Sequence, residues 1–175
     1  GFFKRNLGKT TSKVKLTAYT TFIRPTLEYA CAVWDPYRQN RIEKLKKIQR
    51  QAARFILSRY RRMDSVTNML EQLSLQPLHT RREIGRLKVI YMFSKDLLNM
   101  DTSDFLQPRI TRPVRGVHNR AMQVPRINND TYKYSFFVRT VERWNKLPES
   151  VVNCDSLALF EKCLLELYQT SHFCL

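Results

Sequence analysis

Residues 40–57 have the sequence NRIEKLKKIQRQAARFIL, and this stretch decides the fold class. Apolar side chains recur in it at spacings of three and four residues, at Ile42, Leu45, Ile48, Ala52, Phe55 and Ile56. This period places them along one side of an α-helix and predicts a buried stripe. Asn40 stands three residues before Glu43, a spacing that resembles the capping box of a helix start.

The remaining sides of this predicted helix are basic. Its cations share one face, because they are spaced three and four residues apart: Lys44, Lys47, Arg50 and Arg54. Arg61 and Arg62 follow, and Glu43 is the only acid between Arg38 and Arg62. The face fits two interpretations, a solvated helix surface and a surface that follows a sugar–phosphate backbone. The basic excess of the whole chain favours the second.

That excess is large. The 175 residues contain 31 Lys and Arg against 15 Asp and Glu, a formal net charge of +16, while 43% hydrophobic residues suffice for a core and exclude wholesale disorder. Such a balance indicates a polyanionic partner, nucleic acid before an anionic membrane surface. The sequence has no run of about 18 apolar residues, the length that would predict a transmembrane helix. Residue 1 is Gly, and we expect the chain to be cut from a longer protein.

Helical periodicity continues on both sides of this stretch. The sequence predicts helices over residues 12–22, from Pro25 to about residue 34, and over 65–73 with Ser65 as the cap. Further predicted helices begin at a capping box formed by residues 80–83, span residues 136–144, and begin near a cap at Asp155 or Ser156. We expect the apolar segment 27–34 to form core, with Trp34 and Trp144 buried. The predicted class is mainly α: a helical bundle over residues 1–106, a connector over 107–131 and a C-terminal helical subdomain over 132–175.

A second group of cations stands near the predicted start of one helix, at Arg81, Arg82 and Arg86. Positive charge opposes the helix dipole at that end. The sequence therefore predicts an anion bound nearby.

The connector is rich in Pro and Arg. Arg109, Arg112 and Arg115 belong to a stretch with no acid between Asp104 and Asp130. It fits a solvated linker and also an arm that lies along phosphates. A small hairpin that turns at residues 128–130 is a weaker prediction.

No catalytic signature emerges. The sequence has no phosphate-binding glycine loop, no H-E-x-x-H, and no Asp-Asp pair for two metal ions. Its three histidines are far apart, and its cysteines, Cys31, Cys154, Cys163 and Cys174, form no C-x-x-C pair. We expect reduced cysteines, with Cys31 and Cys163 packed on helix faces, and a segment that binds without catalysis or cofactor.

An ordered series of blocks carries a resemblance to a known family. The most specific are Arg24-Pro25-Thr26-Leu27-Glu28-Tyr29-Ala30 and Trp144-Asn145-Lys146-Leu147-Pro148; between them come Val33-Trp34-Asp35-Pro36-Tyr37 and Gln49-Arg50-Gln51-Ala52-Ala53-Arg54-Phe55. The series resembles the C-terminal portion of jockey-like non-LTR (LINE-type) retrotransposon polyproteins, from the reverse-transcriptase thumb onward. The resemblance extends from Phe2 to about Tyr168.

The resemblance implies that residues 1–106 are a helical thumb beside a template–primer duplex. The parent would be an RNA-directed DNA polymerase that uses Mg²⁺, whereas this chain lacks the palm Asp-Asp motif and would not be an enzyme by itself. Its implied partners are RNA, RNA–DNA hybrid or DNA and the palm domain of its own polyprotein, in a nuclear or cytoplasmic ribonucleoprotein, with no membrane.

A separate hypothesis stays open: a free-standing basic helical module that binds an acidic protein or an anionic membrane. In a cut segment, we also expect exposed apolar surface around Phe2, Phe3 and residues 29–34.

Overall fold

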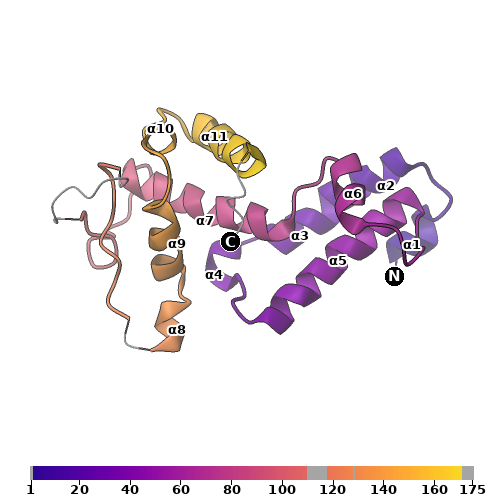
Figure 1. The fold of residues 1–175 in the computed structure, drawn as a ribbon, viewed down its shortest axis with the longest axis horizontal. Helices are drawn as coiled ribbons and strands as arrows, with labels where there is room; N and C mark the ends of the chain where they lie inside the picture. Colours follow the sequence, from indigo (N-terminus) through magenta and orange to yellow (C-terminus); the bar gives the residue numbers. More distant parts are fainter. Residues whose placement is uncertain (1, 110–117, 128, 171–175) are drawn as a thin grey trace. The chain divides into compact units, whose positions relative to one another are not determined.

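The fold is a series of helices in two compact units, residues 1–82 and 83–175. The computed structural model describes residues 2–109, 118–127 and 129–170, and Figure 1 shows their ribbon. The predicted mainly α class is confirmed for these ranges, where the only β-pairing is an isolated bridge between Pro108 and Met122. The two units meet within one helix, whereas the sequence predicts a boundary at residue 106. Each unit is described by itself.

The first unit begins with α1 (Phe2–Leu7) and then an unbroken helical path of three elements: α2 (Ser12–Ala18), the π-helix η1 (Tyr19–Ile23) and α3 (Arg24–Glu28). Pro25, which has no N–H to donate, lies in the first turn of α3, directly after Arg24, whose N–H donates to the Tyr19 carbonyl in the π-helix pattern. The predicted helix start at Pro25 is thus accommodated by a π-turn rather than a break. Ala30, in the left-handed conformation with φ 49°, separates α3 from α4 (Cys31–Trp34).

The long helix of this unit is α5 (Gln39–Leu57), which packs against α2 and against α6 (Val66–Gln72). Its stripe is rotated from the prediction, because Gln49, Ala53 and Ile56 are buried while Ile48 is 38% exposed. The predicted capping box at Asn40 is wrong. Arg38 is the N-cap, and its side chain makes no cap hydrogen bond. The Glu43 carboxylate accepts hydrogen bonds from Lys46 and Arg50 and does not cap the helix start.

The buried amide of Gln49 connects α5 to the start of the next helix. Its Nε2 donates to the Gln76 carbonyl at 2.8 Å, and its Oε1 accepts from the Leu78 amide at 3.1 Å. Leu78 is the first residue of α7 (Leu78–Ser94), so the predicted start at Thr80 is two residues late. The side chain of Gln49 performs the capping that the sequence assigns to Thr80.

The predicted core segment 27–34 is largely at the surface. Cys31 is buried, but Tyr29 is 80% and Val33 87% exposed. Trp34 is 39% exposed and donates its indole N–H to the Tyr29 carbonyl, so its expected burial is wrong. The expectation of exposed apolar surface is confirmed here and at Phe2, which is 68% exposed, whereas Phe3 is half-buried.

The second unit contains the rest of α7 with α8 (Asp130–Lys133), α9 (Phe136–Trp144), α10 (Glu149–Val152) and α11 (Leu157–Thr170). Its core brings together Ile90 and Tyr91 from α7, Trp144 from α9, and Phe160 and Leu164 from α11, all 1% exposed or less. The predicted burial of Trp144 is confirmed. The Ser156 hydroxyl accepts from the Leu159 amide, as expected for the cap of α11.

Two described parts of the connector lie side by side. Residues 107–109 and 121–123 exchange backbone hydrogen bonds, and the Asn145 side chain pairs with both the N–H and the C=O of Met122. The indole of Trp144 donates to the Arg120 carbonyl, and His118 Nε2 lies 2.9 Å from the Trp144 carbonyl. The predicted hairpin around residues 128–130 is wrong, since Asn129 caps α8 and residues 130–133 are helical.

Candidate nucleic-acid interface

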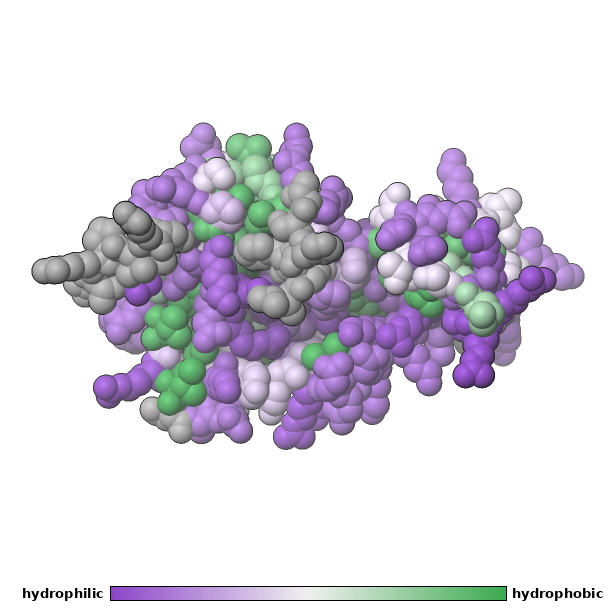
Figure 2. Space-filling view, viewed as in Figure 1, coloured by the Kyte–Doolittle hydropathy of each residue, from purple (hydrophilic) through white to green (hydrophobic). Residues whose placement is uncertain are grey.

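Most of the net positive charge belongs to the first unit. Residues 1–82 contain 18 Lys and Arg and 5 Asp and Glu, a net charge of +13, and residues 83–175 contain 13 and 10, a net charge of +3. A polyanion would therefore be attracted to the first unit. Figure 2 shows hydrophilic side chains over much of the visible surface of α5.

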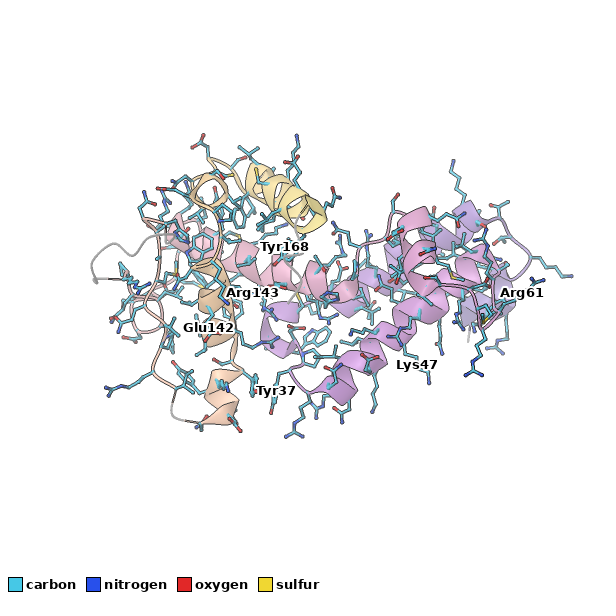
Figure 3. All side chains as sticks on the ribbon, in the orientation of Figure 1. Tyr37, Lys47, Arg61, Glu142, Arg143 and Tyr168 are labelled. Carbon is cyan, nitrogen blue, oxygen red and sulfur yellow. The ribbon has the colours of Figure 1, made fainter. Side chains whose placement is uncertain are left out.

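The most accessible cations are on α5. Lys44, Lys47 and Arg50 are exposed, and Figure 3 labels Lys47 where its side chain leaves the helix. In the part of the chain that the structure describes, the ammonium groups of Lys44 and Lys47 make no ion pair. These two lysines and Arg50 follow one another at three-residue spacing, which fits contacts along a phosphate backbone.

Glu43 is the acid that competes for these cations. It lies 3.1 Å from Lys46 and 3.3 Å from Arg50, and the hydrogen bond from Lys46 lowers the pKa of its carboxyl. Both pairs are at the surface, where solvent screens the attraction between the charges. A phosphate could therefore replace Glu43 as the partner of Arg50 at little cost.

Arg54 continues the face but is half-buried, and its Nε is buried without a hydrogen-bond partner. Next along α5 is the ring of Phe55, which has the Lys15 ammonium 5.0 Å from its centre. Lys15 is buried and donates to the Ser58 hydroxyl at 3.0 Å, so it holds α2 to the end of α5. The accessible part of the face consequently ends near Arg50.

A second exposed group lies in the turn after α5. Arg61 and Arg62 are exposed, and Tyr60 between them and the helix is 58% exposed. The backbone N–H of Arg61 donates to the Asp64 carboxylate, while its side chain, labelled in Figure 3, is at the surface. An exposed aromatic ring beside cations is a combination that single-stranded nucleic acid can stack on.

Two cations that the sequence places in this interface, Arg81 and Arg82, are both engaged by acids of the first unit. Arg81 binds both carboxylate oxygens of Glu28, at 2.5 and 3.0 Å. Arg82 is 2% exposed and its Nε lies 2.6 Å from Asp35. Burial lowers the pKa of Arg82, and the charges of Cys31 and Glu28 partly offset this. The anion that the sequence predicts near these cations is thus a pair of carboxylates within the chain.

The sequence contains a signal for these pairs. Glu28 and Asp35 are the only acids in the first 42 residues of a strongly basic segment. A carboxylate that is surrounded by many cations and few other acids is expected to form an ion pair with one of those cations.

The remaining predicted site residues are Arg86, Arg109, Arg112 and Arg115. Arg86 is 6% exposed, which removes it from the accessible surface of the second unit. Arg109 is exposed, and its backbone N–H donates to the Ala121 carbonyl. Arg112 and Arg115 lie outside the described residues.

The second unit has its own buried charge pair. Arg143 Nε lies 2.6 Å from Glu83, with side chains 20% and 11% exposed. Burial and the charge of Glu83 raise the pKa of the Tyr168 hydroxyl, and Figure 3 labels Arg143 and Tyr168. These contacts lie inside the unit, so they hold helices and offer no surface to a large ligand.

Two kinds of site are absent from the described ranges. No group of three or more His, Cys, Asp and Glu residues within them could hold a metal ion. No helix among them combines the length and the apolar character that crossing a membrane requires.

No protein-family model, curated protein or solved structure matches this chain significantly.

Proposed function

We propose that this chain is a non-catalytic segment that grips the sugar–phosphate backbone of RNA, RNA–DNA hybrid or DNA. The observation that carries the proposal is the +13 charge of the first unit together with the exposed, regularly spaced cations of α5. Lys44 and Lys47 would contact phosphates directly, and Arg50 would exchange Glu43 for a phosphate. Arg61 and Arg62 would extend the contact beyond the end of the helix.

The grip would be tolerant of sequence. Lysine ammonium groups on a helix surface neutralise phosphates and release counterions without contacting base edges. Tyr60 would add stacking on unpaired bases, which is also tolerant of sequence.

The larger protein we propose for this segment is a reverse transcriptase of a jockey-like non-LTR retrotransposon, with residues 1–82 as part of its thumb. The ordered sequence blocks support this, and so does the helical make-up of the first unit. In such a protein the exposed apolar residues around Phe2 and Val33 would lie against the palm. The polymerase chemistry, with its Mg²⁺, would belong to that palm.

The test is fluorescence anisotropy of the full chain with a labelled RNA–DNA hybrid, duplex DNA and single-stranded RNA, with heparin as a competitor. The informative variant is K44A/K47A/R50A. Its matched control, K133A/K146A/K162A, removes three exposed cations from the second unit and therefore has the same formal net charge. We expect the first variant to bind at least tenfold more weakly and the control to bind within about twofold of the wild type.

Equal losses in the two triple variants would reduce the proposal to general attraction by net charge. Binding to acidic proteins or anionic vesicles, with none to nucleic acid at 50 mM salt, would refute it and favour a basic interaction module.

A further inference from the structure

Two cysteines of the second unit lie close together although they are nine residues apart in sequence. The sulfur atoms of Cys154 and Cys163 are 3.7 Å apart. Cys154 follows α10 and is 6% exposed, and Cys163 is in α11 and half-buried. A sulfur–sulfur distance of this size is close to van der Waals contact, and a disulfide needs about 2.05 Å.

The backbone around both cysteines is fixed by the core. The Tyr91 hydroxyl donates to the Cys154 carbonyl at 2.7 Å and its ring stacks on Phe160, which is one turn of α11 before Leu164 and next to the Cys163 turn. Phe160 and Leu164 are fully buried on either side of Cys163. The two sulfurs are therefore held near each other by packing, which favours reaction between them over reaction with other thiols.

The hydrogen bonds give the two sulfurs different roles. The Cys154 thiol has two acceptors within reach, the Ser150 carbonyl at 3.6 Å and the Cys163 sulfur at 3.7 Å. Burial, followed by the hydrogen bond to Cys163, raises the pKa of Cys154 to about 11. Cys154 therefore retains its proton, and Cys163 is the more exposed of the two residues.

We propose that Cys154 and Cys163 form a reversible disulfide when the chain meets a peroxide. The Cys163 sulfur attacks one oxygen of hydrogen peroxide, the O–O bond breaks, and a sulfenic acid and one water form. The Cys154 sulfur then attacks the Cys163 sulfur, its proton leaves with the departing hydroxyl as a second water, and the S–S bond forms. The two thiols lose two electrons in total and the peroxide gains them. A dithiol reductant reverses the change by thiol–disulfide exchange. This inference does not depend on the proposed nucleic-acid binding.

The consequence is a covalent link between the end of α10 and the middle of α11. It closes a short loop beside the core of the second unit and restricts its unfolded state. We expect the thermal transition of the oxidised chain to lie above that of the reduced chain.

The experiment uses the full chain with the single change C174S. Trypsin separates Cys154 from Cys163 at Lys162 but leaves Cys163 and Cys174 in one peptide, so this change makes the assignment unambiguous. After treatment with hydrogen peroxide, we expect a mass loss of about 2 Da, the mass of the two hydrogens removed. Peptide mapping should recover residues 147–162 joined to the peptide that begins at Cys163, and dithiothreitol should restore the mass. Buried Cys31 should stay reduced and serves as the internal control.

A second variant, C154S/C174S, keeps the proposal falsifiable if the first behaves unexpectedly. Without Cys154, the sulfenic acid on Cys163 should persist and react with dimedone. Both free thiols surviving in C174S at peroxide doses that oxidise a free-cysteine peptide would overturn the proposal. Oxygen addition to Cys163 with no joined peptide would also overturn it.

Discussion

The buried ion pair between Arg82 and Asp35 gives the most decisive prediction about how the first unit is held together. The guanidinium is 2% and the carboxylate 9% exposed, and Nε and Oδ1 lie 2.6 Å apart. In D35A the guanidinium would stay buried and charged, since arginine does not lose its proton in proteins. Breaking a buried pair from one side costs about 3–5 kcal/mol. The matched control is E43A, which removes a carboxylate that is 41% exposed and should therefore destabilise the fold far less than D35A.

Urea denaturation followed by far-UV circular dichroism measures both variants. With a urea slope of about 1–3 kcal/mol per M, D35A should lower the midpoint by roughly 1–5 M, and E43A should lower it by a much smaller amount. The apolar replacement D35L/R82M should recover much of the loss, because it removes the unpaired charge together with its partner. A midpoint for D35A that equals that of E43A would refute the assignment of Arg82 to the interior.

Four further predictions concern other parts of the chain. N145A should free the Met122 amide and carbonyl, destabilise the second unit by about 1–3 kcal/mol and increase hydrogen exchange at Met122; unchanged exchange there would contradict the role of Asn145. Because the pKa of Cys154 is raised from 9.0 to about 11, its alkylation by iodoacetamide should stay slow at pH 8.5 and accelerate toward pH 11. Because burial favours the neutral thiol in the folded chain, Cys154 adds stability that is fully present below pH 9 and is lost as the pH rises through about 11. Unfolding by urea should therefore become easier over that range, and a flat profile would argue against burial of this thiol. Y29K/V33K should reduce self-association in light scattering with no fall in the thermal midpoint, since both side chains are at least 80% exposed; a lower midpoint would show that they are packed.

Local signals predicted the helices well where the structure depends on them. The three- and four-residue period gave α5, and single cap residues, Ser65 and Ser156, gave the starts of α6 and α11. The start of α7 was wrong because its capping comes from Gln49, 29 residues earlier. No pattern within residues 78–83 contains that information.

The two tryptophans illustrate the same limit for burial. Both stand in apolar stretches and both were expected in the core, yet Trp144 is fully buried and Trp34 is 39% exposed. What distinguishes them is the packing of α7 and α11 around Trp144, which depends on long-range contacts.

The candidate site was predictable only in part, for a related reason. A cation on a helix is equally compatible with solvent, a phosphate or a carboxylate far away in sequence. Lys44 and Lys47 remain accessible, whereas Arg81 and Arg82 are paired with acids 53 and 47 residues away. Helical spacing identified the faces, and the distant acids decided which of them stay open.

The salt dependence of binding tests the central proposal most directly. The dissociation constant for an RNA–DNA hybrid would be measured between 50 and 200 mM salt for the wild type, K44A/K47A/R50A and K133A/K146A/K162A. If each α5 cation neutralises one phosphate, the first variant should reduce the slope of log K against log salt by about 3, and the control should keep the wild-type slope. An unchanged slope in the α5 variant would contradict the proposal that this helix grips the backbone.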